Sequence, residues 1–277
     1  MTNLDAQACN EIADYIRIGD PWAKAIEKTQ MRRMLNANEL CPVPPEQCDG
    51  KAKVNGRLFQ CPFVDTQECP YHQQRQRIKM QRFLKRIGVP VDAQNPRWDR
   101  VPDSYRDQLR LYADTIGERI VHGDGLILAG GVGCGKTCAL ALIADSARGG
   151  YAVEYRYAAD LYDALHNQDG KVQTARGCDL LLVDDWGTEY PSRWAGNRFQ
   201  QLINHRHGNR KSTCLTMNMS IAAIKEKREL QRIYDRLRER NAVLETTAES
   251  QRQPMSTQKW LADTTTASKE PNDERSM

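Results

Sequence analysis

The feature that most constrains this chain is the loop Gly130-Gly-Val-Gly-Cys-Gly-Lys-Thr137, which lies between an aliphatic segment and a helical one. Glycines let backbone N–H groups turn inward around phosphate oxygens, and the amino end of the following helix favours the same anion. The match to G-x-x-x-x-G-K-[ST] in this setting predicts a nucleotide site; a glycine-rich turn that binds nothing is the alternative. We expect Lys136 to reach the β- and γ-phosphates of ATP and Thr137 to bind Mg²⁺. The predicted nucleotide-binding residues here are Gly130, Gly131, Val132, Gly133, Cys134, Gly135, Lys136 and Thr137.

Two adjacent acids follow the most aliphatic segment of the chain, in Leu180-Leu-Leu-Val-Asp184-Asp185. A carboxylate at the tip of a strand beside the phosphate loop can hold Mg²⁺, directly or through water, and we assign this role to Asp184. The next side chain points differently and can polarise an attacking water as a general base, so we assign that role to Asp185. A helix cap or a solvated turn is the alternative, because aspartate is common after strands.

Asn218 follows another predicted strand, in Thr213-Cys-Leu-Thr-Met-Asn218. A polar side chain at that strand tip would lie between the two acids and the γ-phosphate, where it can orient water. An asparagine after a strand is, taken alone, a turn former. Its position in the order of motifs is what makes it a catalytic candidate.

Short aliphatic segments alternate with helical ones from residue 103 onward. Expected strands span 125–129, 152–157, 179–183, 212–217 and 242–247. Expected helices span 104–120, 136–147, 159–166, 194–206 and much of 221–240. Strands that alternate with crossover helices predict an α/β fold with a parallel sheet covered on both faces.

Four cysteines form a separate, Pro- and Gly-punctuated module before this region, with the spacing Cys41-x6-Cys48-x12-Cys61-x7-Cys69. Four thiolates, or three with the imidazole of His72, would satisfy tetrahedral Zn²⁺. The segment has little apolar content, so a metal would supply much of its stability. The gaps are longer than those usual in a zinc pair, and free thiols or an iron–sulfur cluster are the alternatives.

The excess of positive charge lies in the same part of the chain. Residues 1–100 hold 16 Lys and Arg against 12 Asp and Glu, whereas the remaining residues hold 24 of each. The segment 75–86, RQRIKMQRFLKR, has six basic residues and no acid, and Gly88 ends its predicted helix. Such a face can follow a phosphate backbone, although a solvated face or the dock for an acidic helix is the alternative.

These patterns divide the chain into four parts. We expect a helical, Cys-rich partner-binding domain at 1–88 that includes helices at 7–17 and 22–36, and a proline-marked linker at 89–102. An ATPase domain at 103–252 and a disordered tail at 253–277 would follow. The lack of a long apolar run and of a secretory signal predicts a cytoplasmic protein with no membrane partner.

The order of phosphate loop, two-acid strand and polar strand tip resembles the AAA+ ATPases, and within them the DnaC/DnaI/IstB group of helicase loaders and transposition helpers. The residues that carry the likeness are GDGLILAGGVGCGKT (123–137), CDLLLVDDWG (178–187), FQQLINHRHGNRKSTCLTMN (199–218) and RIYDRLRER (232–240). The resemblance covers about residues 100–252. It implies a P-loop AAA+ domain with five parallel strands, preceded here by a small helical and zinc-binding domain.

The resemblance also implies residue roles and an oligomer. Asn218 takes the place of the first sensor, Arg236 that of the arginine finger that completes a neighbour's site, and Arg252 falls near the second sensor arginine. Another arginine within about one helical turn of Arg236 is the alternative for the finger, because several arginines lie near it in the sequence. Asp185 stands where most AAA+ proteins have glutamate, so the hydrolysis rate is in question.

The function expected from this resemblance is ATP-dependent loading of a replicative helicase, with ATP, Mg²⁺ and Zn²⁺ as cofactors. The partners would be the helicase, single-stranded DNA and further copies of the chain. An IstB-like transposition helper is the close alternative. A small-molecule P-loop kinase and a zinc-bearing DNA-binding adaptor with a vestigial nucleotide site are more distant ones.

Overall fold

The computed structural model describes residues 51–54, 57–60, 72–167, 170–187 and 193–252. The chain divides into two compact units, Met1–Arg82 and Phe83–Met277. The predicted helices at 7–17 and 22–36, the four zinc-candidate cysteines and the predicted disordered tail lie outside the described residues. The predicted domain boundaries therefore stay predictions.

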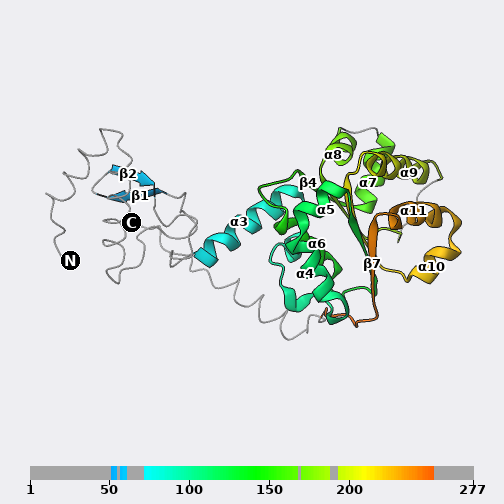
Figure 1. Cartoon of the computed structure of the whole chain (residues 1–277), viewed down its shortest axis with the longest axis horizontal. Coiled ribbons are helices and arrows are strands. Elements are labelled where there is room, and N and C mark those ends of the chain that lie inside the picture. The colour runs from blue at the N-terminus through cyan, green and yellow to red at the C-terminus, as the bar shows by residue number, and fades with distance from the viewer. Residues whose placement is uncertain (1–50, 55–56, 61–71, 168–169, 188–192, 253–277) are drawn as a thin grey trace, which may run out of the picture. The chain divides into compact units, whose positions relative to one another are not determined.

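The described part of the first unit contains a β-hairpin that the sequence patterns did not predict (Figure 1). Strands β1 (Lys51–Val54) and β2 (Arg57–Gln60) pair antiparallel, with Lys51 opposite Gln60. The sequence between them is Asn-Gly, the dipeptide that most favours a two-residue hairpin turn, so a signal for this element was present.

Helix α3 (His72–Ile87) contains the boundary between the units. Its last turns belong to the second unit, where Phe83, Leu84 and Ile87 are buried. The helix ends at Gly88, whose φ of 93° places it in the left-handed region that glycine adopts without strain. Of the six basic residues expected on an exposed face, Arg75 is instead buried.

The second unit is built on a five-stranded sheet in the order β4-β5-β6-β3-β7. Every neighbouring pair of strands is parallel, which confirms the predicted fold class. The strands are β3 (Gly125–Gly130), β4 (Val153–Tyr157), β5 (Leu180–Asp184), β6 (Ser212–Met217) and β7 (Asn241–Thr246).

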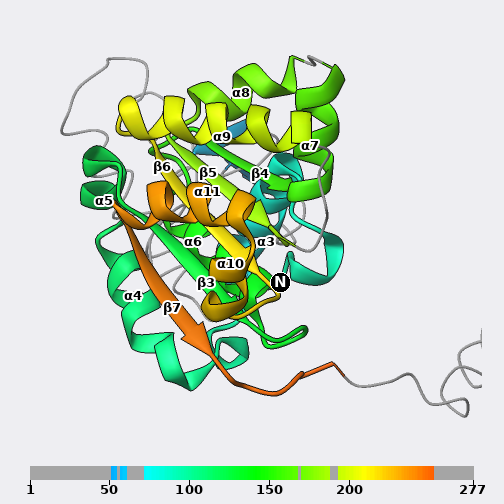
Figure 2. The ribbon, with the colours of Figure 1, turned by 90° about the vertical axis from the view of Figure 1, so that its right-hand side faces the viewer.

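Helices cover both faces of this sheet, as Figure 2 shows. One face packs against α4 (Arg106–Asp114), α5 (Ile116–His122) and α6 (Lys136–Ser146). The other face carries α7 (Ala158–Asn167), α8 (Lys171–Gly177), α9 (Arg193–Gly208), α10 (Ile221–Glu226) and α11 (Arg228–Arg238). Strands β3, β5 and β6 are buried along their whole length, which explains the continuous aliphatic sequences of β3 and β5.

Three helical segments differ from their predictions. The helix expected at 104–120 is two helices that meet at Thr115, whose hydroxyl donates a hydrogen bond to the Leu111 carbonyl at 2.7 Å. Helix α8 was not predicted, because it is short and has little apolar periodicity. The helical stretch expected at 221–240 is α10 followed by α11.

The side chain of Arg206 on α9 is fully buried and joins three elements of the second face. Its guanidinium donates hydrogen bonds to the Ala175 carbonyl at 2.7 Å, to the Cys178 carbonyl at 3.0 Å and to the Thr213 hydroxyl at 2.9 Å, and also to the Ser212 carbonyl. A buried cation is stable only with such partners. Arg206 therefore fixes α9 against α8 and the start of β6.

The segment expected as a linker, 89–102, is part of the second unit and packs against α6. It contains the 3₁₀ turns η1 (Val91–Ala93) and η2 (Trp98–Arg100), and a third, η3 (Asp103–Tyr105), leads into α4. Val89 and Val101 are buried, at 2% and 0% exposure. Among the described residues, no helix is long and apolar enough to cross a membrane.

Candidate functional site

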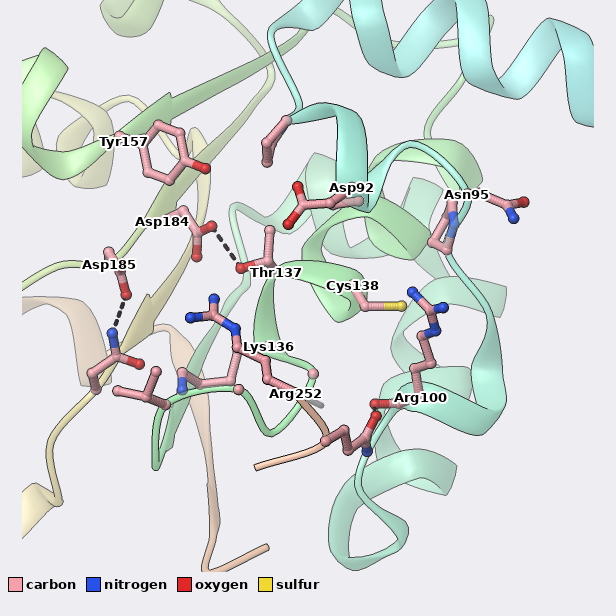
Figure 3. Close-up of a pocket in the computed structure, with 18 residues that line it drawn as sticks. Asp92, Asn95, Arg100, Lys136, Thr137, Cys138, Tyr157, Asp184, Asp185 and Arg252 are labelled. Carbon is pink, nitrogen blue, oxygen red and sulfur yellow. Dashed lines mark hydrogen bonds between the residues drawn. The ribbon is translucent and has the colours of Figure 1, made fainter. Parts of the chain in front are cut away.

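A cavity of about 400 Å³ opens at the carboxyl ends of the strands, where polar side chains from several elements converge (Figure 3). Its wall combines the phosphate loop, the tips of β4, β5 and β6, the segment 90–100, and two residues that follow β7. The lining residues are Pro90, Asp92, Ala93, Asn95, Pro96, Arg100, Val132, Gly133, Gly135, Lys136, Thr137, Cys138, Tyr157, Asp184, Asp185, Asn218, Gln251 and Arg252.

The phosphate loop runs from the end of β3 to the start of α6 and depends on glycine geometry. Gly133 and Gly135 have φ values of 78° and 98°, which side-chain-bearing residues rarely adopt. A Cβ atom on Gly135 would lie 2.0 Å from the carbonyl oxygen of Arg100. The loop is thus pressed against the segment that precedes α4, and no side chain fits at this contact.

Lys136 is buried, with 5% of its surface exposed. Its Nζ donates hydrogen bonds to the carbonyls of Gly130 at 3.0 Å and Gly131 at 2.6 Å, and lies 3.6 Å from the Cys134 sulfur. Within the described part of the chain its hydrogen-bond partners are these carbonyls and the thiol, and no carboxylate forms an ion pair with it. A buried cation at the amino end of α6 suits a polyphosphate.

The carboxylate of Asp184 is held by three hydroxyl groups from three different elements. The Thr137 hydroxyl donates to Oδ2 at 2.8 Å, and the Tyr155 hydroxyl donates to the same oxygen at 2.6 Å. The Thr216 hydroxyl donates to Oδ1. Burial, followed by the charge of Asp184, raises the pKa of Tyr155 far above its usual range, so this phenol stays a donor.

Asp185 follows β5 in a left-handed conformation, with φ of 62°. Its backbone N–H donates to the Thr216 hydroxyl at 3.0 Å, and the Asn218 amide donates to its Oδ1 (Figure 3). Burial raises the pKa of Asp185, and the charge of Asp184 raises it further, whereas Lys136, Asn218 and Arg252 lower it. A carboxyl group whose pKa is raised in a cavity is suited to accept a proton.

The residues at this site fit a magnesium ion. The Thr137 hydroxyl and the Asp184 carboxylate are hard oxygen donors that lie within hydrogen-bonding distance of each other on the cavity wall. Mg²⁺ is typically held by one or two carboxylates together with substrate phosphates and water. The described residues contain no group of three or more His, Cys, Asp or Glu that could hold a metal, and a Mg²⁺·nucleotide site does not require one.

The predicted site residues fall into three groups. Lys136, Thr137, Asp184, Asp185 and Asn218 come together around the cavity, and Arg252, the weakest of the sequence assignments, lines it as well. The four predicted zinc ligands, Cys41, Cys48, Cys61 and Cys69, lie outside the described residues, as does the side chain of His72. Arg236 is described and lies elsewhere.

Arg236 does not reach the cavity of its own chain. Its guanidinium donates to both carboxylate oxygens of Glu239 at 3.1 Å and to the Asn204 side chain at 3.3 Å. It borders a small hollow that is also lined by Gly123 and Asn241, beside the amino-terminal ends of β3 and β7. The nucleotide cavity lies at the opposite, carboxyl ends of the strands.

Sequence patterns missed several contributors to the site. The prolines of 89–102 indicated a linker, whereas Pro90, Pro96 and their neighbours form part of the cavity wall. Gln251 closes the same wall: its N–H donates to the Gly133 carbonyl at 3.0 Å and its side chain donates to the Arg100 carbonyl at 3.2 Å. The apolar Val89 and Val101 were a signal that this segment packs against the domain.

The fold and the site together define an α/β P-loop protein of the AAA+ type. The family profile of the IstB-like ATP binding proteins matches residues 111–259, and the chain belongs to that family. A search of curated proteins gives no match.

Two solved structures are similar in fold. The DnaC helicase loader is 22% identical, with a TM-score of 0.50 over 57% of this chain and 100% of that one. DnaI is 24% identical, with a TM-score of 0.50 over 60% of this chain and 95% of that one.

Proposed function

We propose that this chain is an ATPase that acts as an oligomer to load a replicative DNA helicase. The observation that carries the ATPase part is the convergence on one cavity of a buried lysine, an Asp–Thr pair and an Asp–Asn pair. No single one of these features is specific. Their combination at the carboxyl edge of a parallel sheet matches the parts needed for phosphoryl transfer to water.

The proposed chemistry divides the work among the residues of the cavity. The loop amides and Lys136 bind the β- and γ-phosphates, and Thr137 and Asp184 hold Mg²⁺. The metal ion, when bound, neutralises phosphate charge. Asp185 accepts the proton of the attacking water, and Asn218 orients both the carboxylate and that water. The raised pKa of Asp185 supports this role, because a stronger base accepts a proton more readily.

The position of Arg236 supports hydrolysis at an interface between subunits. A finger arginine stabilises charge on the transferring phosphoryl group, and Arg236 cannot do this for the cavity of its own chain. The Arg236 side chain is 43% exposed, so a neighbouring subunit can reach it. Glu239 would release it when that subunit docks.

The loader assignment rests on the likeness in fold to DnaC and DnaI, together with the basic and cysteine-rich region that precedes the ATPase domain. We propose that residues 1–88 bind the helicase, that four cysteines there hold Zn²⁺, and that the ATPase domain contacts single-stranded DNA. A transposition helper is the second candidate, and the family match fits it as well as it fits the loader.

A binding experiment with the full chain separates these two functions. The purified chain would be mixed with the host's replicative helicase, or with a transposase encoded beside the chain, in ATP or ADP, and complexes would be resolved by size-exclusion chromatography. An ATP-dependent complex with the helicase supports the loader. A complex with the transposase alone would refute the loader function and support the transposition-helper function.

The nucleotide site is tested separately with Lys136→Ala. Loss of this ammonium should abolish binding of a fluorescent ATP analogue and all ATP turnover. Turnover at the wild-type rate would refute the site assignment whichever partner is found.

A further inference from the structure

Tyr155 brings a phenol hydroxyl to Asp184 from the neighbouring strand. It is the third residue of β4, its side chain is 1% exposed, and β4 pairs with β5 in a register that sets Tyr155 opposite Leu182. Its hydroxyl donates to Asp184 Oδ2 at 2.6 Å. No motif of the phosphate site includes this strand, so the contact comes from the tertiary structure alone.

The three donors hold the Asp184 carboxylate from both sides. Strand β5 lies between β4 and β6, so Tyr155 approaches from one neighbour and Thr216 from the other. The third donor, Thr137, comes from α6. The torsion that turns an aspartate carboxylate is broad and nearly two-fold, so without fixed donors the group can rotate. Donors from two strands remove that freedom.

Packing fixes the position of the Tyr155 hydroxyl. Its ring packs edge-on against Tyr157, with ring centroids 5.7 Å apart, and is enclosed by the sheet and its helices. The position of a phenol oxygen is fixed once its ring is fixed. Tyr155 therefore presents a donor at a fixed place to the Asp184 oxygen that faces Thr137.

We propose that Tyr155 is a positioning residue of the nucleotide site, whose hydroxyl fixes the rotation of the Asp184 carboxylate and thereby sets the affinity of the site for the divalent cation that accompanies ATP. This inference rests on the proposed ATPase function. It assigns to β4 a part in metal binding that the sequence motifs give only to the phosphate loop and β5.

The alternative is that the Tyr155 hydroxyl only needs a hydrogen-bond acceptor in the protein interior and has no role in metal binding. A buried phenol needs some partner, and Asp184 could be that partner without any effect on the metal. The two possibilities differ in what Tyr155→Phe changes. A structural role affects only the stability of the fold, whereas a positioning role weakens cation binding in the folded protein.

The test measures cation binding directly on the full chain. Mn²⁺ would be titrated by electron paramagnetic resonance in the presence of a non-hydrolysable ATP analogue. Loss of a group that hydrogen-bonds to a metal ligand typically weakens metal binding about 10- to 100-fold. We therefore expect Tyr155→Phe to bind Mn²⁺ about tenfold more weakly than the wild type. Its affinity for the analogue in EDTA should match that of the wild type.

Tyr112→Phe is the matched control. Tyr112 is also a buried tyrosine, and its hydroxyl donates to the Asp124 carbonyl at 2.9 Å, near the amino end of β3 and away from the cavity. It should leave Mn²⁺ affinity within twofold of the wild type. Tyr155→Leu repeats the loss of the hydroxyl with a different apolar side chain, should Tyr155→Phe fail to fold.

The outcomes separate the inference from the function on which it rests. If the wild type binds no Mn²⁺ with the analogue, the proposed nucleotide site is wrong. If the wild type binds Mn²⁺ and the folded Tyr155 variants bind it equally well, the site stands and the role of Tyr155 is overturned. A loss in the Tyr155 variants that Tyr112→Phe does not share supports the inference.

Discussion

Thr216 is a buried residue that forms hydrogen bonds with both acids of the site, Asp184 and Asp185. It lies on β6 with 0% exposure, and its hydroxyl both donates to Asp184 Oδ1 and accepts the backbone N–H of Asp185 at 3.0 Å. Thr216→Val replaces this hydroxyl by a methyl group of nearly the same shape. The change therefore tests the hydrogen bonds without opening a cavity.

The expected loss of stability follows from those two bonds. A hydrogen bond to a charged group contributes about 1.5–3 kcal/mol, and an unsatisfied buried N–H costs about 1–3 kcal/mol. Burial of the added methyl offsets about 0.8 kcal/mol. We expect the free energy of unfolding to fall by about 2–5 kcal/mol, which in a unit of this size lowers Tm by about 4–20 °C.

Urea unfolding followed by tryptophan fluorescence measures this loss, and the fully buried Trp186 beside the site is a suitable reporter. The same variant should lower kcat for ATP more than it raises KM, because Asp185 loses the contact that fixes its backbone. Thr216→Ser keeps the hydroxyl and should retain most of kcat. An unfolding free energy within 0.5 kcal/mol of the wild type, together with an unchanged kcat, would refute the reasoning.

Three further predictions concern the finger, the base and the core. Arg236→Ala should bind ATP but hydrolyse it about 10³-fold more slowly, and mixing it with Lys136→Ala should partly restore turnover; no rescue would exclude action in trans. Asn218→Ala removes a hydrogen bond that lowers the pKa of Asp185. Because only the deprotonated base is active, the acid limb of the kcat–pH profile should move to higher pH, and an unmoved limb would contradict this pairing. Arg206→Met leaves four carbonyl groups without this donor and should lower the free energy of unfolding by about 3–5 kcal/mol, measured in urea. A loss below about 1 kcal/mol would show that water or neighbouring groups replace the guanidinium.

Much of the second unit could be predicted from local patterns, because those patterns record burial and phosphate chemistry directly. Continuous aliphatic segments such as Leu180–Val183 reflect strands that are buried on both faces. The loop that ends in Lys136 and Thr137 needs its glycines wherever it occurs, since side chains do not fit the backbone angles or the contact with Arg100. Fold class and the phosphate site were therefore readable from the sequence.

Elements with weak local signals were missed. Helix α8 is short and only weakly periodic, and the junction of α4 and α5 at Thr115 is a local change of backbone angles that a hydrophobic pattern does not register. The Asn-Gly pair at 55–56 is a local signal for the hairpin β1–β2, and it lies within a cysteine-rich stretch whose pattern is also typical of metal binding.

The parallel sheet, the phosphate loop and the acids at the strand tips follow from local sequence, because each is encoded within a few consecutive residues. The distant groups that complete the site are known only from the packing of the chain. Tyr155 and Thr216 reach Asp184 because β4 and β6 flank β5, and the segment 89–102 lines the cavity because it packs against the loop. Arg236 is separated from its own cavity by the length of the sheet. Contacts of this kind depend on the order of strands in space, which no local pattern contains.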